Sequence, residues 1–170
     1  MKVKILKLHP DAVIPAYAKT GDAGMDLTAV SRHVDEYGNI CYGTGLAFEI
    51  PEGHVGLVFP RSSNCKKGII LTNCVGVIDS GYRGEVSFKF RPSFYMAESC
   101  THIENPEGFG LPSDADDWYH IKNLELCDIY KVGERIGQII IMPYPQIEFE
   151  EVEELSETER GTKGYGSSGA

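Results

Sequence analysis

The feature that most constrains the fold is an alternation of apolar and polar residues with a period of two, punctuated by glycine and proline. In segment 86–91 every second residue is apolar, and segments 2–5 and 55–59 have the same period. This alternation indicates half-buried β-strands, whereas no long segment has the period of an amphipathic helix. The best helix candidate, 62–67, is short. The sequence therefore predicts an all-β fold: a jelly roll or distorted β-barrel of short, mainly antiparallel strands with one short helix.

One apolar run departs from the alternation. Residues 139–142, Ile-Ile-Ile-Met, are all apolar and precede Pro143. A continuous run of this kind is typical of a strand that is covered on both faces. We therefore expect this strand at the centre of a sheet or at a contact between subunits.

The charge and the cysteines restrict the classes of partner and compartment. The formal net charge is -9 over 170 residues, which disfavours stable binding to a nucleic-acid backbone. No stretch approaches the roughly 18 apolar residues of a membrane span, and the first residues form no apolar signal region. The five cysteines form no Cys-x-x-Cys pair, so buried free thiols are expected. We expect one globular domain, located in the cytoplasm.

Two segments interrupt the strand pattern. Residues 93–127 are polar and rich in turn residues around the single tryptophan, which indicates an excursion from the core. Glutamates crowd the segment 148–159, and their mutual repulsion is expected to keep it extended. The expected organisation is a β domain over 1–159, which includes the excursion, followed by a mobile glycine-rich lid over 160–170.

The last residues combine groups that suit a nucleotide. Residues 160–169 contain cations, hydroxyls, several glycines and the ring of Tyr165. Glycines let backbone N–H groups turn toward an anion, cations and hydroxyls bind phosphate, and a ring can stack on a base. The Walker arrangement is absent, so phosphate would be held by another geometry. The alternative is a solvated tail without a ligand, which is common for such termini.

A carboxylate marks a tight turn in the middle of the chain. Segment 73–86 is expected to form a strand, a turn at Ser80-Gly81 and a second strand. Asp79, at the mouth of this hairpin, is placed to act as a base, and Tyr82 puts a ring beside it. The simpler alternative is an aspartate that only caps a turn.

A second cluster suits an anion. Arg61, Ser62 and Ser63 precede the short helical segment. A guanidinium, two hydroxyls and backbone N–H groups therefore converge at a helix start, where they can bind an anion such as phosphate. Taken alone, an Arg-Ser-Ser sequence at a protein surface is unremarkable.

Five motifs, in order, carry a resemblance to a known family. They are Ala-Gly-Met-Asp-Leu at 23–27, Pro-Arg-Ser-Ser at 60–63 with Lys-Gly at 67–68, the segment 76–85, Gly-Glu-Arg-Ile-Gly-Gln at 133–138, and the glycine-rich tail. Together they resemble the five motifs of the trimeric deoxyuridine triphosphate nucleotidohydrolases (dUTPases). The resemblance implies a jelly-roll protomer and a homotrimer with active sites between subunits. It also implies hydrolysis of dUTP to dUMP and pyrophosphate, which limits uracil in DNA and supplies dUMP for dTMP synthesis.

The resemblance assigns a role to each matching residue. Asp79 would be the general base that activates water for attack on the α-phosphorus. The residues around the uracil and deoxyribose would be Asn73, Gly76, Val77, Ile78, Tyr82 and Tyr165. The phosphate-binding residues would be Arg61, Ser62, Ser63, Gln138, Arg160, Gly166, Ser167 and Ser168. The ring of Tyr82 beneath the sugar would exclude a 2′-hydroxyl, and cytosine would leave buried groups unpaired.

Magnesium is the cofactor that the resemblance implies. Mg²⁺ would be bound through substrate phosphates and waters, and Asp26 would reach it only through water, so no direct protein ligand is expected. A zinc site is the alternative at Cys100, His102, His120 and Cys127, but the irregular spacing of these residues favours a plain loop.

The sequence also departs from the family pattern. Tyr165, Lys163, Gly137 and the pair Asn64-Cys65 are mild departures. The larger one is the 93–127 excursion, which is longer than the usual link between the third and fourth motifs. It could be an elaborated loop, a contact within the trimer, or a docking site for a protein partner.

Two other functions compete with dUTP hydrolysis. A regulatory protein could sense the nucleotide at this site and bind a partner through 93–127. A dCTP deaminase shares the fold, but it needs a glutamate on the strand after the turn, and residues 86–97 contain no carboxylate. We therefore expect dUTP as the ligand, with neither a nucleic acid nor a membrane among the partners.

Overall fold

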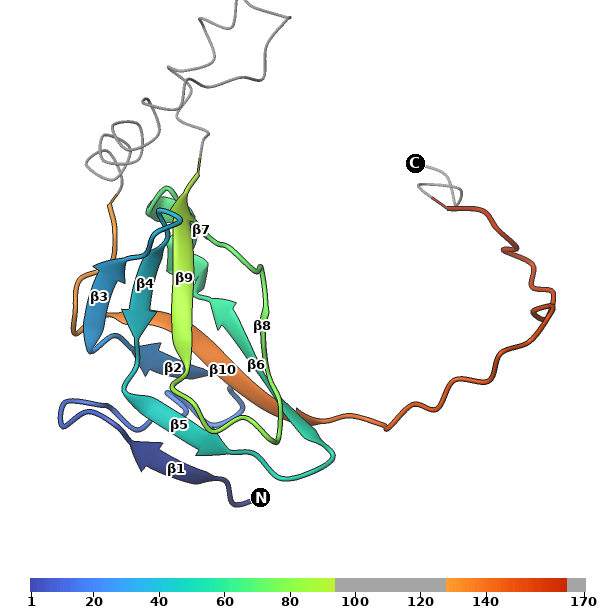
Figure 1. Ribbon diagram of the computed structural model, residues 1–170, viewed down its shortest axis with the longest axis horizontal. Helices are drawn as coiled ribbons and strands as arrows, with labels where there is room; N and C mark the ends of the chain where they lie inside the picture. The colour runs from blue at the N-terminus through green and yellow to red at the C-terminus, as the bar shows by residue number, and fades with distance from the viewer. Residues whose placement is uncertain (94–127, 165–170) are drawn as a thin grey trace, which may run out of the picture.

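The computed structural model describes residues 1–93 and 128–164, and they form the all-β fold that the alternation predicts (Figure 1). The elements are β1 (Lys4–Lys7), β2 (Met25–Thr28), β3 (Ser31–Val34), β4 (Ile40–Gly43), β5 (Leu46–Glu49), β6 (His54–Pro60), η1 (Ser62–Lys66), β7 (Ile69–Leu71), β8 (Gly76–Ile78), β9 (Ser87–Pro92) and β10 (Arg135–Pro143). The expected short helix is the 3₁₀ helix η1.

Two four-stranded antiparallel sheets enclose the core. One has the strand order β2-β10-β6-β8 and the other β3-β4-β9-β7, while β1 pairs with β5 separately. Neighbours in the sheets come from distant parts of the chain: β4 pairs with β9, and β10 lies between β2 and β6. These crossovers give the jelly-roll arrangement, and they bring the first, second and fourth sequence motifs to neighbouring strands.

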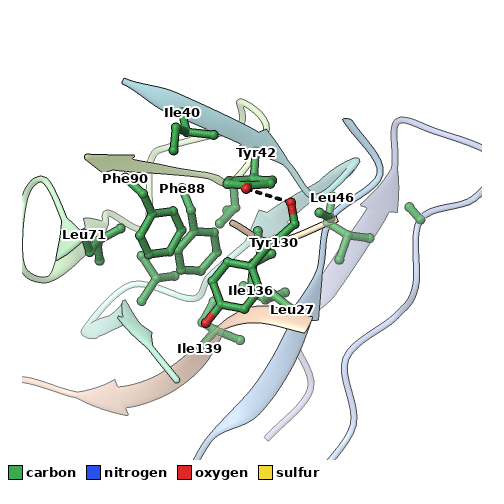
Figure 2. Close-up of a cluster of buried hydrophobic side chains, with 14 of the residues drawn as sticks. Leu27, Ile40, Tyr42, Leu46, Leu71, Phe88, Phe90, Tyr130, Ile136 and Ile139 are labelled. Atoms are coloured by element: carbon green, nitrogen blue, oxygen red, sulfur yellow. Dashed lines mark hydrogen bonds between the residues drawn. The ribbon is translucent and has the colours of Figure 1, made fainter. Parts of the chain in front are cut away.

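The core lies between the two sheets and is built from alternating side chains. On β9 the burial alternates as the sequence predicts, with Phe88 and Phe90 buried and Ser87, Lys89 and Arg91 exposed. Figure 2 shows aromatic and aliphatic side chains of both sheets gathered in one cluster. Tyr130 lies in this cluster, and its backbone carbonyl accepts a 2.8 Å hydrogen bond from the Tyr42 hydroxyl.

The opposite face of the β2-β10-β6-β8 sheet is also apolar, and we call it the outer face. Cross-strand partners point to the same side of a sheet, so the register places six apolar residues on it. These are Val55, Leu57, Phe59, Val77, Ile140 and Met142. Within the chain they are only half-buried or exposed, whereas Val58 and Ile139, which alternate with them, are in the core. The run 139–142 is therefore central in its sheet, as expected, but this chain alone covers only one of its faces.

The segment after β10 leaves the body of the protein. Residues 144–164 contain no strand, and all of them are exposed. Figure 1 shows this arm extending away from the two sheets. The extended conformation agrees with the repulsion expected among its glutamates.

The cysteines of the described segments are free thiols, but only one of the three is buried. Cys41 is buried, whereas Cys65 and Cys74 are exposed. The expectation of buried thiols was therefore wrong for the two that lie in η1 and in the turn before β8, because both belong to surface connections.

No helix in residues 1–93 and 128–164 has the length and apolar character needed to cross a membrane.

Gly137 is the residue of β10 that the core requires to be small. A Cβ atom at this position would overlap the ring of Phe88 on the facing sheet and would also come within 2.9 Å of the Phe59 carbonyl oxygen. Phe88 is itself fully buried, so its ring has little space into which to move. The Phe88 ring therefore fills the space that the absence of a side chain at Gly137 leaves between the two sheets.

Replacing Gly137 by Ala, the residue usual in the resembled motif, is expected to destabilise the protein by about 1–3 kcal/mol because it overpacks the core. Thermal and denaturant unfolding at one fixed protein concentration measure the loss. Gly164→Ala is the matched control, because nothing lies within 4 Å of a Cβ there. Equal stability of Gly137→Ala and the wild type would show that Phe88 can relax.

Candidate active site

Two arginines bind one carboxylate where β2, β6 and β10 meet. The Asp26 carboxylate accepts a hydrogen bond from Arg61 Nε at 2.9 Å and one from an Arg135 terminal nitrogen at 3.0 Å. Asp26 lies on β2, Arg61 directly follows β6, and Arg135 begins β10, so the sheet order itself assembles the group. We call Asp26, Arg61, Ser63, Arg135 and Gln138 the arginine cluster.

The rest of the cluster follows from the strand register and the 3₁₀ turn. Gln138 lies opposite Asp26 in the β10–β2 pairing and donates a 3.4 Å bond to the Pro60 carbonyl. Its side-chain oxygen occupies the space that a Cβ of Gly24 would need, so the glycine of the motif 23–27 leaves Gln138 in this position. Ser63 Oγ accepts a 3.5 Å bond from Arg61, and Ser62 is exposed beside it.

This cluster has the chemistry of an anion site. One carboxylate faces two guanidinium groups, so a positive charge remains, and Arg61 keeps N–H donors that are not used by Asp26 or Ser63. Two surface pockets involve the cluster: one of about 470 Å³ is lined by Arg61 and Ser62, and one of about 360 Å³ is lined by Asp26 and Gln138. A phosphate chain could be bound here by charge and by hydroxyl donors.

The carboxylate of Asp26 is not arranged as a metal ligand. Both of its oxygens are bonded to arginines. Within 1–93 and 128–164, no three His, Cys, Asp or Glu side chains gather in a group that could bind a metal ion. A cation at this site would therefore need ligands from a bound molecule and from water.

The turn that carries Asp79 is held by bonds within itself. The Tyr82 N–H donates to the Asp79 carbonyl at 3.0 Å, which closes the expected turn at Ser80-Gly81. The Tyr82 hydroxyl donates to the Glu85 carbonyl at 3.0 Å, and Arg83 donates to the carbonyl of Ser80 at 2.6 Å. The Asp79 side chain is exposed, so a stiff turn presents a carboxylate that is free to accept a proton.

The turn does not join the two strands of a hairpin, and that prediction was wrong. β8 pairs with β6 in one sheet, whereas β9 pairs with β4 and β7 in the other. Alternation and a Ser-Gly turn are the same for a hairpin and for a connection between facing sheets, so the sequence pattern could not distinguish them. Asp79 therefore lies where the chain passes from one sheet to the other.

The remaining residues expected around the base and sugar lie close to this turn. Val77 is exposed and Ile78 is half-buried on β8, and Asn73 is exposed in the turn before it. Gly76 is buried, and Val58 fills the space that a side chain would need. The ring of Tyr82 occupies the space above Gly84 and is 45% exposed, so one face of it is open to a ligand.

One chain does not bring Asp79 and the arginine cluster together. Asp79 follows Ile78, which pairs with Gly56 near the start of β6, whereas Arg61 follows the last residue of β6. At the rise of a β-strand this separation is about 20 Å. A general base must lie within hydrogen-bond reach of the proton that it accepts. The two halves of the site therefore cannot act on the same phosphate within one chain.

The tail residues are described only in part. Arg160 is exposed on the arm, and its Nε donates a 3.0 Å bond to the Lys163 carbonyl. Tyr165, Gly166, Ser167 and Ser168 lie outside the described residues, as do Cys100, His102, His120 and Cys127.

Sequence reasoning missed Arg135. The residue is part of the motif 133–138, but no role was assigned to it there. Its ion pair with Asp26, at 3.0 Å, is the contact that connects the first and fourth motifs. The only sequence signal for this ion pair is that an arginine and an aspartate occur in two motifs, each of which suits an anion site.

Comparison with known proteins identifies the family of this chain. The family model for dUTPase matches residues 11–93 and 120–169. The deoxyuridine 5′-triphosphate nucleotidohydrolase of Nautilia profundicola is 38% identical over 171 residues, which cover 99% of each protein. That of Rhodococcus erythropolis is 34% identical over 99% of this chain and 87% of the relative.

Solved structures share the fold. The dUTPase of Staphylococcus bacteriophage 80alpha with dUPNHPP superposes with a TM-score of 0.70 at 27% identity and covers 99% of each chain. A mutant dUTPase from phage phi11 of S. aureus, described with a structural Mg(II) ion, has a TM-score of 0.62 at 20% identity over 91% of this chain and 98% of its own.

Proposed function

This chain belongs to the dUTPase family and hydrolyses dUTP, and from that premise we propose that Asp79 is its general base and the arginine cluster its triphosphate site. Asp79 takes a proton from water as the water oxygen bonds to the α-phosphorus. The bond from that phosphorus to the bridging oxygen breaks, and pyrophosphate leaves while dUMP remains. The exposed carboxylate on a self-bonded turn is the observation that carries this assignment.

The phosphates bind Arg61, Ser63 and Gln138 of the arginine cluster and the neighbouring Ser62. Asp26 orients the Arg61 guanidinium by its 2.9 Å bond, so that the remaining N–H donors face the ligand. The phosphate oxygens and waters would hold Mg²⁺, and a bound ion would offset charge on the triphosphate. Asp26, with both oxygens bonded to arginines, reaches the ion only through water.

The uracil and deoxyribose bind beside β8. Asn73 and the backbone of Gly76, Val77 and Ile78 pair with the base. The Tyr82 ring lies beneath the sugar and leaves no space for a 2′-hydroxyl. Its position is fixed by the hydroxyl bond to Glu85 and by contact with Gly84. A rigid ring is the support for this steric discrimination against UTP.

The functional unit is a homotrimer in which each active site combines two or more chains. The separation of about 20 Å between Asp79 and Arg61 requires a second copy to complete the site. The apolar outer face, which includes Leu57 and Ile140, continues into Asp26 and Gln138 on the same side of the sheet. A copy that covers this face therefore lies next to the arginine cluster.

Pyrophosphate release measured with dUTP, dTTP, dCTP and UTP in the presence of Mg²⁺ tests the proposed substrate site. Strong preference for dUTP over all three is expected. Each competitor either carries an extra group that clashes with the site or leaves a buried polar group without a hydrogen-bond partner. Comparable turnover of UTP would contradict the role of Tyr82. In the cell this reaction limits uracil in DNA and supplies dUMP for dTMP synthesis, and the expected compartment is the cytoplasm.

The arm carries the fifth motif to the site of another chain. Arg160, Tyr165, Gly166, Ser167 and Ser168 close over the bound nucleotide as a lid. Support comes from the exposed, extended course of residues 144–164, which carries Arg160 away from its own core (Figure 1).

Truncation before Arg160 is expected to lower turnover severely, about a hundredfold or more, because water exclusion and phosphate contacts are lost together. Steady-state kinetics measure this effect. Thermal unfolding is expected to be unchanged, because residues 144–164, which lead into the removed segment, are all exposed. Normal turnover of the truncated protein would contradict the lid.

A regulatory role for residues 93–127 is the second candidate. The family model does not match residues 94–119, so most of this segment is additional to the common domain. The phage 80alpha relatives are described as controlling the transfer of virulence genes by a G protein-like mechanism. Deletion of 93–127 with unchanged hydrolysis would leave the segment available for a partner, whereas lost hydrolysis would make it part of the enzyme.

A further inference from the structure

Tyr130 is a buried tyrosine behind the arginine cluster to which no function has yet been assigned. It is 2% exposed, and its ring contacts Tyr42 and Phe90 at centroid distances of 6.1 and 5.8 Å. Its hydroxyl is buried and makes no hydrogen bond of good geometry within 1–93 and 128–164. A buried tyrosine hydroxyl normally has a partner, so this one needs an explanation.

The groups around the Tyr130 hydroxyl belong to the arginine cluster and its neighbours. Burial raises the pKa of Tyr130, while the Ser63 side chain and the charges of Lys67 and Arg61 act in the opposite direction. Lys67, which directly follows η1, lies over the Tyr130 ring, so η1 and its Ser63 side chain are on the side of the phenol. In the chain described here, Ser63 Oγ has only a 3.5 Å bond from Arg61, which is at the limit of hydrogen bonding and leaves the hydroxyl free to rotate.

A cation strengthens the phenol as a donor. Lys67 Nζ lies 4.7 Å from the centre of the Tyr130 ring and forms ion pairs with Asp128 at 3.3 Å and Glu134 at 3.9 Å. Its side chain is only 14% exposed, so water screens the charge little, although the nearby Glu134 carboxylate raises the pKa of Tyr130 and opposes part of the effect of Lys67. A positive charge over the ring withdraws electron density from the phenol oxygen and makes its O–H more acidic.

The helix that carries Ser63 is fixed from the other side. The Asn64 amide donates a 2.7 Å bond to the Ile69 carbonyl, which ties η1 to β7. With both η1 and the Tyr130 ring held in place, rotation about the Ser63 side chain is the remaining freedom between them. The geometry therefore favours a short hydrogen-bond chain over a structural rearrangement.

We propose that Tyr130 is a positioning residue for Ser63: its hydroxyl donates to Ser63 Oγ, and the Ser63 hydroxyl donates to a phosphate oxygen of the substrate. The inference rests on the proposed phosphate-binding role of Ser63. In such a chain each bond polarises the next, so Ser63 becomes a stronger donor when Tyr130 bonds to it. Tyr130 touches no substrate and acts only through Ser63.

A double-mutant cycle tests this inference with a non-hydrolysable imido analogue of dUTP as the probe. Tyr130→Phe is expected to weaken binding of the analogue about fivefold and to raise KM with little change in kcat. In a Ser63→Ala background the same substitution is expected to have no effect, because the residue through which it acts is gone. The inference would be overturned if Tyr130→Phe weakened binding by the same factor in both backgrounds, or if it did not weaken binding at all.

Matched variants separate the possible failures. Tyr42→Phe removes an equally buried hydroxyl, which donates to the Tyr130 carbonyl, and it is expected to leave KM unchanged because Arg32 also holds that carbonyl. Unchanged affinity in Ser63→Ala alone would refute the phosphate role of Ser63, whereas a defect in Ser63→Ala without one in Tyr130→Phe would refute only the positioning role. If Tyr130→Phe unfolds, Lys67→Met replaces it in the double-mutant cycle. A loss of affinity for the analogue that disappears in the Ser63→Ala background supports the inference, and a loss that is the same in both backgrounds contradicts it.

Discussion

Asp79→Asn is expected to lower the turnover of dUTP by a factor of about a thousand or more while the nucleotide still binds. An amide has nearly the shape of the carboxylate but cannot take a proton from water, so the loss falls on the chemical step. The turn itself should remain, because its bonds come from the backbone of Asp79 and from Tyr82 and Arg83. Single-turnover pyrophosphate release measures the rate, and calorimetry with the imido analogue measures binding.

Glu52→Gln is the matched control for this substitution. Glu52 is an exposed carboxylate that lines the same surface pocket as Ser80 and Gly81, so the variant removes the same charge beside the same turn. Its turnover should stay near the wild-type rate. Hydrolysis in ¹⁸O-labelled water provides an independent check, because the label must enter dUMP. Label in pyrophosphate, or near-normal turnover in Asp79→Asn, would refute attack at the α-phosphorus by water activated at this residue.

Two inactive variants are expected to restore activity when they assemble together. An Asp79→Asn chain keeps an intact arginine cluster, and an Arg61→Ala chain keeps an intact Asp79. These residues lie at opposite ends of β6, so in the proposed trimer each active site takes them from different copies. Every mixed trimer contains one site in three that combines an intact Asp79 with an intact Arg61, so about a third of the wild-type activity per site is expected.

Co-expression with two affinity tags and purification over both isolates the mixed oligomers for this test. Each parent variant is first assayed alone to establish its residual activity. Asp79→Asn mixed with Asp79→Ala is the matched control: it forms the same mixed oligomers but never supplies the carboxylate, so no recovery is expected. Mixed oligomers of the first pair that stay inactive would show that both halves of a site come from one chain.

The alternating pattern was enough to predict β6 and β9 and to overlap β1, but not the way in which the strands pair. Segment 86–91 alternates because one face of β9 meets the core, so its burial could be predicted residue by residue. The sequence around Ser80-Gly81 contains no information about which sheet receives the next strand, and the expected hairpin was wrong. Pairing depends on contacts between distant segments, which a local period does not record.

The candidate site, like the fold, could be predicted from the sequence only in part. Arg61, Ser63, Asp26 and Gln138 could be grouped from motifs, and the structure brings them together on neighbouring strands. The role of Arg135 could not be predicted, because it depends on the register between β2 and β10. The distance between Asp79 and Arg61 could not be predicted either, since it follows from the length and direction of β6.

The fit between Gly137 and the Phe88 ring has a consequence for how this sequence can change. Alanine at 137 should become tolerable only after Phe88 has been replaced by a smaller residue, because alanine alone creates a clash, whereas the Phe88 replacement alone leaves a cavity. The effect of either substitution thus depends on which one occurred first. Two lineages of the same enzyme could then reach different cores that cannot be interconverted by any single viable step.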